Sequence, residues 1–141
     1  MSCVIRAYGR DFDVDAFVAH SSLKPLIVVR RGEARAPSSK DLALRQQQQS
    51  GMNLSVSTRE FSDLDDQIED AIQFLVENEA ELRRLRGFHG LERMSLDFPI
   101  EERDVIFQSD AFPARLLLLL GALQIDLVVS RYPASAAPSN P

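Results

Sequence analysis

The chain has 141 residues, a net charge of −5 at pH 7 and a pI near 5.0. This length favours one domain with a sizeable core, and the ordinary apolar and charged fractions exclude a wholly disordered chain. The negative charge argues against a nucleic-acid backbone as the main partner.

The one cysteine, Cys3, permits no internal disulfide and favours a reducing compartment. The start of the sequence lacks the basic and apolar regions of a secretory signal. The apolar run Leu116–Leu120 is too short to cross a bilayer. We therefore expect a cytoplasmic domain that is not held in a membrane.

The N-terminal part predicts a strand, a helix and a second strand. Cys3–Tyr8 alternates between two faces and stops at Gly9. Asp11 or Asp13 has the residue type that caps a short helix ending near His20, with Val14, Phe17 and Val18 turned inward. Leu26–Arg31 is β-branched and apolar on both alternating faces, which predicts a strand that is well covered.

The segment from Glu33 to Ser50 has few apolar residues and contains Pro37 and a run of glutamines. Long connections of this kind are usually loops and are sometimes functional. A short helix over Lys40–Gln48 is the alternative. After this segment, Met52–Thr58 alternates as a strand, with Met52, Leu54 and Val56 inward.

One face of a long helix is marked by apolar residues at steps of three and four between Ser62 and Gly87. These residues are Leu64, Ile68, Ala71, Ile72, Leu75, Leu82 and Leu85. Ser62 and Asp65 have the spacing of a capping box, and Gly87 supplies a left-handed residue to end the helix. The acidic first turn and the final arginines, including Arg84, match the helix dipole, which explains the basic cluster without a ligand.

The C-terminal part predicts a strand, a helix and a last strand. Arg93–Ile100 alternates, with Met94, Leu96 and Phe98 inward. Ala111–Leu123 is apolar around its axis and has Pro113 near its start, so we expect a heavily buried helix. Ile125–Tyr132 reads as the final strand. We assign residues 1–132 to one domain and 133–141 to a disordered tail.

The expected order is β-α-β-β-α-β-α-β. Its first six elements follow the ferredoxin-like β-α-β-β-α-β order, with a helix and a strand appended. The fold class is therefore α+β, with a mainly antiparallel sheet packed on helices.

Short motifs along most of the chain resemble a bacterial family. They are R-R-G-E at Arg30–Glu33, S-G-M-N-L-S at Ser50–Ser55, L-D-F at Leu96–Phe98 and I-D-L at Ile125–Leu127. Together with the acidic start of the long helix, they are similar to a domain-of-unknown-function family of small α+β proteins sometimes found near toxin–immunity loci. This resemblance implies a fold and supplies no reaction.

Most chemical motifs are absent from the sequence. There is no glycine-rich phosphate loop, nucleophile elbow or paired-cysteine zinc pattern. His89 and Glu92 offer two metal ligands where a site needs three or four, and His20 fits the end of a short helix. Cys3 beside apolar strand residues is best interpreted as unreactive filler. We therefore expect no metal and no cofactor.

The one candidate site is a polar sheet face. If the helices cover mainly one face of the sheet, polar side chains gather on the other: Asn53, Ser55, Ser57, Ser95, Asp97 and Asp126, with Arg6 joining them if the first strand is central. Carboxylates beside hydroxyls and a guanidinium suit a polar ligand or a basic side chain of a partner. The plainer alternative is a face that is polar only because water covers it.

Three functions fit this face. The first is a non-enzymatic protein-interaction module, in its narrower form an immunity-type protein, that presents an acidic surface. The second is a small-ligand binding or regulatory domain. The third is an enzyme in which Asp97 and Asp126 act as an acid–base pair, which requires them to be close and differently solvated. The oligomeric state stays open, with a homodimer among the alternatives.

Overall fold

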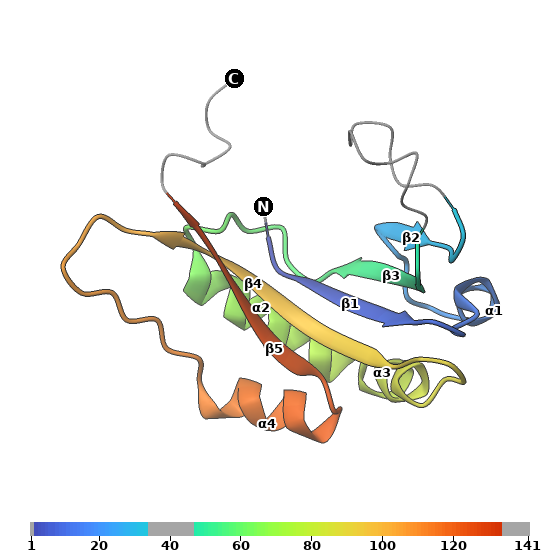
Figure 1. The fold of residues 1–141 in the computed structure, drawn as a ribbon. Helices are drawn as coiled ribbons and strands as arrows, with labels where there is room; N and C mark the ends of the chain where they lie inside the picture. The colour runs from blue at the N-terminus through green and yellow to red at the C-terminus, as the bar shows by residue number, and fades with distance from the viewer. Residues whose placement is uncertain (1, 34–46, 134–141) are drawn as a thin grey trace.

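The computed structural model describes residues 2–33 and 47–133. Within these ranges the chain forms one sheet of five strands and four helices (Figure 1), which confirms the α+β class. The strands are β1 Val4–Gly9, β2 Ile27–Val29, β3 Ser50–Ser55, β4 Arg93–Glu102 and β5 Asp126–Pro133. The helices are α1 Val14–Ala19, α2 Leu64–Glu77, α3 Glu79–Arg86 and α4 Ala114–Ala122.

β1 lies at the centre of the sheet, whose strand order is β2-β3-β1-β4-β5. β1 runs antiparallel to both β3 and β4, and β2 runs antiparallel to β3. β5 pairs in parallel with β4 at one edge. The sheet is therefore mixed, and α4 provides the crossover connection that a parallel pair requires.

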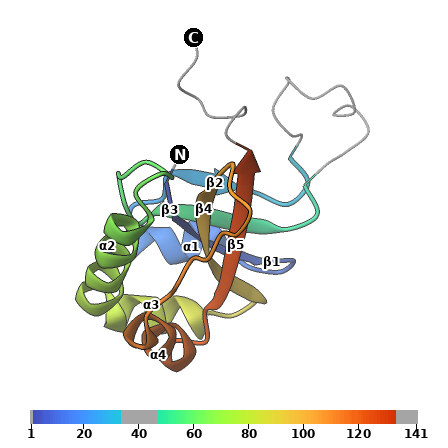
Figure 2. The same cartoon turned by 90° about the vertical axis from the view of Figure 1, so that its left-hand side faces the viewer.

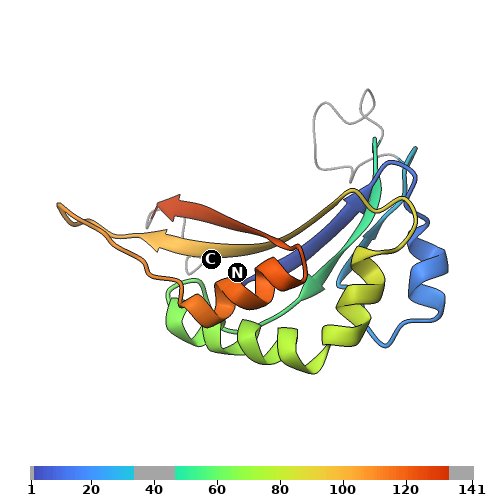
Figure 3. The same ribbon diagram turned by 90° about the horizontal axis from the view of Figure 1, so that it is seen from below.

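Helices α2, α3 and α4 lie on the same face of the sheet (Figures 2 and 3). Alternation along the strands directs one set of side chains towards these helices. The buried core from the strands and from α2 and α3 consists of Ile5, Ala7, Met52, Leu54, Met94, Leu96, Phe98, Ile68, Ala71, Ile72, Leu75, Leu82 and Leu85. The other face of the sheet, which we call the open face, carries the candidate site.

The predicted long helix is interrupted at Asn78, which separates α2 from α3. Both the backbone N–H and the side-chain amide of Asn78 donate to the carbonyl of Phe74, at 3.0 and 2.9 Å. The expected capping box is wrong: α2 starts after Asp63, and no side chain caps it. Gly87 ends α3 at φ −88°, so the expected left-handed residue is also wrong.

Two segments are less covered than the sequence predicts. β2 has only three residues, and as an edge strand it leaves Ile27 49% exposed beside Leu26 at 63%. α4 buries Leu116 and Leu120 but exposes Leu117 and Leu118. Both segments lie at the periphery of the fold, where only one side of each meets the core. The apolar composition of a segment does not indicate whether it lies at the centre or at the periphery of the fold.

β4 extends beyond the end of its pairing with β1. The β1–β4 register ends at Asp97, whereas β5 pairs with β4 as far as Glu102. Pro99 lies in this extension and pairs with Ser130. A proline has no backbone N–H to donate. Because Pro99 lies beyond the part of β4 that pairs with β1, it removes no hydrogen bond between these two strands.

Two predicted segments lie largely outside the described residues. The connection from Glu33 to Ser50 includes residues 34–46, and the assigned tail includes residues 134–141, and neither of these ranges is described. The predicted helix over Lys40–Gln48 lies mostly within the first of them. β5 ends at Pro133, close to the predicted end at Tyr132.

Candidate functional site

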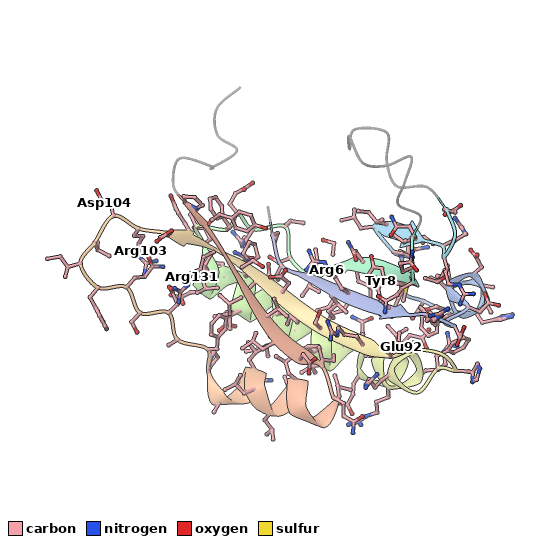
Figure 4. All side chains as sticks on the ribbon, in the orientation of Figure 1. Arg6, Tyr8, Glu92, Arg103, Asp104 and Arg131 are labelled. Atoms are coloured by element: carbon pink, nitrogen blue, oxygen red, sulfur yellow. The ribbon has the colours of Figure 1, made fainter. Side chains whose placement is uncertain are left out.

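The open face is organised around β1, because β1 has a partner strand on each side. Arg6 lies opposite Asn53 of β3 and opposite Ser95 of β4. Residues that share a register position point to the same face of a sheet. Arg6 and Tyr8 therefore project from the centre of the open face, away from Ile5 and Ala7 in the core (Figure 4).

Arg6 binds the carboxylate of Asp97 on the neighbouring strand. The Nη1–Oδ2 distance is 2.5 Å, and the second oxygen of Asp97 accepts a bond from the Ser130 hydroxyl at 2.8 Å. The Asp97 side chain is only 11% exposed, whereas that of Arg6 is 43% exposed. The carboxylate is thus held and neutralised inside the protein, and the guanidinium keeps a side that faces solvent.

A second polar contact lies next to Arg6 and joins β1 to β3. The Tyr8 hydroxyl donates to the side-chain oxygen of Asn53 at 2.9 Å and so links β1 to β3. Burial raises the pKa of Tyr8, and nearby Arg6 acts in the opposite direction. Tyr8 therefore remains a neutral hydrogen-bond donor at physiological pH.

A pocket of about 280 Å³ lies beside Arg6. Its lining residues with polar groups are Ser2, Arg6, Asn53, Asp97 and Tyr132, and its apolar lining residues are Val4, Leu26, Ile27 and Pro99. Phe61, from the connection between β3 and α2, packs edge-on against the Tyr132 ring with centroids 6.3 Å apart. The pocket therefore combines apolar walls with polar groups, among them the solvent-facing side of the Arg6 guanidinium.

Comparison with known proteins identifies the family. The model of a domain of unknown function, DUF4279, matches residues 1–134. The chain belongs to the DUF4279 family. No curated protein and no solved structure matches it.

In this DUF4279 domain, the predicted site residues do not form one acidic surface. Asp97 is paired with Arg6, whereas the side chain of Asp126 is exposed and makes no hydrogen bond or ion pair with another described residue. Ser95 is opposite Asp126 in the register but is 7% exposed. Of the two aspartates, only Asp126 is freely accessible, and they do not form a matched acid–base pair.

The predictions for the serines of β3 have different outcomes. Ser55 is exposed at the end of β3. Ser57 was expected beside it but is 6% exposed, and its hydroxyl donates to Asp70 of α2 at 2.7 Å. The prediction for Ser57 is wrong because β3 ends at Ser55, and strict alternation does not hold beyond a strand.

Several residues of the DUF4279 site were missed by sequence reasoning. Tyr8, Ser130, Tyr132, Leu26 and Ile27 all line the pocket or hold its polar groups. Two of them were predictable: Tyr8 shares the parity of Arg6 on β1, and Ser130 shares the parity of Asp126 on β5. Leu26 and Ile27 gave no such signal, because an apolar run does not reveal which side is uncovered.

The described residues of the DUF4279 domain offer neither a metal-binding group nor a reactive thiol. Among the described residues, no group of three or more His, Cys, Asp or Glu side chains could hold a metal ion. Burial raises the pKa of the Cys3 thiol to about 12, so the thiolate needed for nucleophilic attack does not form near neutral pH. Within residues 2–33 and 47–133, every helix is too short or too polar to span a bilayer.

Proposed function

We propose that this DUF4279 domain is a non-enzymatic protein-interaction module that binds a partner protein on the open face of its sheet. The proposal rests on one observation. The accessible side of Arg6 lies beside a small pocket whose rim includes the exposed apolar residues Leu26 and Ile27. Arginine and aromatic residues are enriched in protein interfaces, and the pocket is lined by both Arg6 and Tyr132.

The size of the pocket favours a protein over a free small molecule. Its volume of about 280 Å³ is at the lower limit of the roughly 300–1,000 Å³ of ligand pockets. A space of this size accommodates one inserted side chain. The surrounding strand surface, including Val128 opposite Asp97 on β5, then supplies the rest of the contact.

The chemistry of the site specifies the inserted group. Asp97 already accepts bonds from Arg6 and Ser130 and is largely buried, so it offers little to a partner. Arg6 retains N–H groups on its exposed side, which bind an acceptor such as a carbonyl or carboxylate oxygen. The inserted group is therefore an acceptor, in place of the basic side chain expected from the sequence.

Further parts of the proposal have their own support. The order β2-β3-β1-β4, with its antiparallel pairings, supports a ferredoxin-like core to which α4 and β5 are appended. Burial of the thiol of Cys3 is compatible with a reducing, cytoplasmic location. An immunity-type role is the narrower form of the proposal and rests on the resemblance of the sequence motifs.

The test uses a matched pair of variants. Ile27→Asp places a charge on the pocket rim, and Val76→Asp places the same charge on α2 at almost the same exposure, 47% against 49%. Proteins captured from a host lysate by the wild-type chain are identified, produced and titrated against both variants. We expect Ile27→Asp to weaken binding by at least about tenfold, as expected for a central interface residue, and Val76→Asp to leave it unchanged. Equal affinity of the wild type and Ile27→Asp would remove the open face from the interface.

A small polar ligand is the second candidate function, because Arg6, Asn53 and Asp97 converge on the same pocket. Native mass spectrometry of the protein purified from its host distinguishes the two. A retained mass of small-molecule size that disappears in Arg6→Ala favours the ligand, and a retained polypeptide favours the partner.

A further inference from the structure

The part of the chain from the β4–α4 connection through α4 to β5 carries most of the exposed apolar side chains of the described residues. Of the ten large hydrophobic residues exposed in the described ranges, seven lie between Val105 and Val129. They are Val105, Ile106, Phe107, Leu117, Leu118, Val128 and Val129. Exposed apolar side chains mark interaction surfaces where they gather. Val128 and Val129 lie next to each other in β5 and project from opposite faces of this strand, Val128 on the open face and Val129 on the helix face. An apolar side chain is therefore exposed on each face of the sheet beside the edge of β5.

β5 also presents a long strand edge. Among the described strands, β5 pairs with β4 alone, and its eight residues span about 26 Å. The other edge strand, β2, has three residues. Proteins usually protect such an edge with proline, lysine or a very short strand. β5 has no lysine, its one proline is the last residue, Pro133, and its two charged residues are Asp126 at the start and Arg131 near the end.

The charges of β5 indicate which partner fits this edge. Asp126 begins the strand and Arg131 lies near its end. A two-fold axis perpendicular to the sheet places two copies of β5 antiparallel, so the negative end of one lies beside the positive end of the other. The two side chains project from opposite faces of the strand, so the attraction acts between strand ends and not as a direct ion pair. A parallel approach would place like charges together.

The alternation of β5 is compatible with this self-pairing. Antiparallel pairing about a two-fold axis matches residues of the same face. With Val129 opposite its own copy, Leu127 faces Arg131, Val128 faces Ser130, and Asp126 faces Tyr132. No like charges are opposed in this register, and the Tyr132 hydroxyl is a suitable donor to a carboxylate. The same surface serves on both subunits, as a two-fold interface requires.

We propose that the edge of β5 is the interface of a homodimer in which two copies of the chain form one continuous ten-stranded sheet. The occupant of the edge is a second copy of this chain. The helices of both subunits then lie on one side of the sheet and both open faces on the other. The two Arg6 pockets are thereby directed to the same side.

Sedimentation velocity and light scattering over about 5 to 500 µM protein test this arrangement. We expect a concentration-dependent dimer for the wild type. Val129→Lys buries a charge at the new strand pair and should raise the dimer dissociation constant by at least about tenfold. Ile27→Lys, on the opposite edge strand, is the matched control and should leave the dimer unchanged. Circular dichroism verifies that each variant is folded.

A charge exchange tests the direction of pairing. Arg131→Asp makes both ends of β5 negative and should weaken the dimer, most strongly near 0.01 M salt, where the Debye length is about 30 Å. Adding Asp126→Arg reverses the polarity and should restore it, which a merely structural role of Arg131 would not do.

Three results would overturn the proposal. The first is a wild-type chain that stays monomeric throughout the concentration range. The second is a dimer that is lost in Ile27→Lys or retained in Val129→Lys. The third is a different protein that binds the monomeric chain and is released by Val129→Lys. Binding to the open face is assayed separately with Ile27→Asp, so either proposal fails without the other.

Discussion

Arg6 and Asp97 pair diagonally across two strands: the register partner of Asp97 is Val4, yet its carboxylate binds the guanidinium two residues further along β1. Ser130 of β5 holds the other carboxylate oxygen. One carboxylate therefore connects the first, fourth and fifth strands of the sheet. The Arg6–Asp97 pair therefore contributes to the stability of the sheet as well as to any binding at the open face.

Replacing Arg6 with alanine should leave the carboxylate of Asp97 largely buried with only the Ser130 bond. We expect a loss of about 1–3 kcal/mol in the free energy of unfolding, the cost of an unsatisfied buried polar group. The loss should be smaller than the roughly 3–5 kcal/mol for a fully buried ion pair, because water reaches the half-exposed Arg6 side. Urea denaturation measures it. A double-mutant cycle with Asp97→Asn should give a coupling energy above about 0.5 kcal/mol, and independent effects would contradict the pairing.

Leu75 is fully buried in α2 at the centre of the core. Leu75→Ala should destabilise the domain by about 2–5 kcal/mol, the range for truncating a buried leucine. The neighbouring Val76 is 47% exposed, so Val76→Ala should change stability by no more than about 0.5 kcal/mol. The two urea midpoints are compared directly, and similar values would show that the assigned core face of α2 is incorrect.

Glu81 and Arg84 of α3 form an ion pair at 2.7 Å. The Arg84 guanidinium stacks over the Phe17 ring at 4.1 Å and donates to the carbonyls of Phe17 and His20, which joins α3 to α1. Its hydrogen bond to Glu81 is the main reason that the pKa of that carboxyl is lowered from 4.5 to about 2. The pair therefore holds α3 against the first helix.

This lowered pKa predicts a pH dependence of stability. A folded-state pKa below the unfolded value contributes stability above about pH 4.5, and this contribution is lost as the pH falls towards 2. Because Arg84 remains partly exposed, we expect an effect on the order of 1 kcal/mol. In Glu81→Gln this part of the decline should disappear. Thermal unfolding between pH 2 and 7 measures it, and parallel curves for the variant and the wild type would exclude the pair as its source.

Gly90 has φ +87°, and a Cβ added there would overlap the backbone of Asp11. Gly90→Ala should therefore cost about 1–3 kcal/mol or more, from backbone strain and the clash. Gly121 in α4 has no atom within 4 Å of an added Cβ. Gly121→Ala should stabilise the domain by up to about 1 kcal/mol, because alanine favours a helix. Thermal shifts of opposite sign are the expected result.

The sequence predicted the buried residues correctly where the spacing of apolar residues within one helix or strand determined which face is buried. The helical stripe around Ile68 and Leu75 and the strand alternation around Met94 and Leu96 both identified core residues. Parity also placed Arg6 on the same face as Asp97. The burial of Asp97 depended on a pairing with Ser130, which follows from the position of β5 in the sheet and not from any local pattern.

The incorrect predictions also concern features that depend on the position of a segment in the fold. The apolar residues of α4 indicated burial, but only one side of this helix meets the core, which leaves Leu118 73% exposed. Asn78 interrupts the long helix although Leu82 and Leu85 continue its buried face. The helical spacing of the apolar residues continues across Asn78, so the sequence pattern does not reveal the break between α2 and α3.

The central position of β1 has a consequence for synthesis of the chain. Val4 pairs with Ser55 and with Asp97, so β1 is synthesised before both of its partner strands. At about 5–20 residues per second, the ribosome needs roughly 5–20 s to extend the chain from Val4 to Asp97. Until then the Cys3 thiol, which burial in the folded domain protects, is accessible to solvent and oxidants. We therefore expect Cys3 to be most susceptible to oxidation before the sheet of a newly made chain is complete.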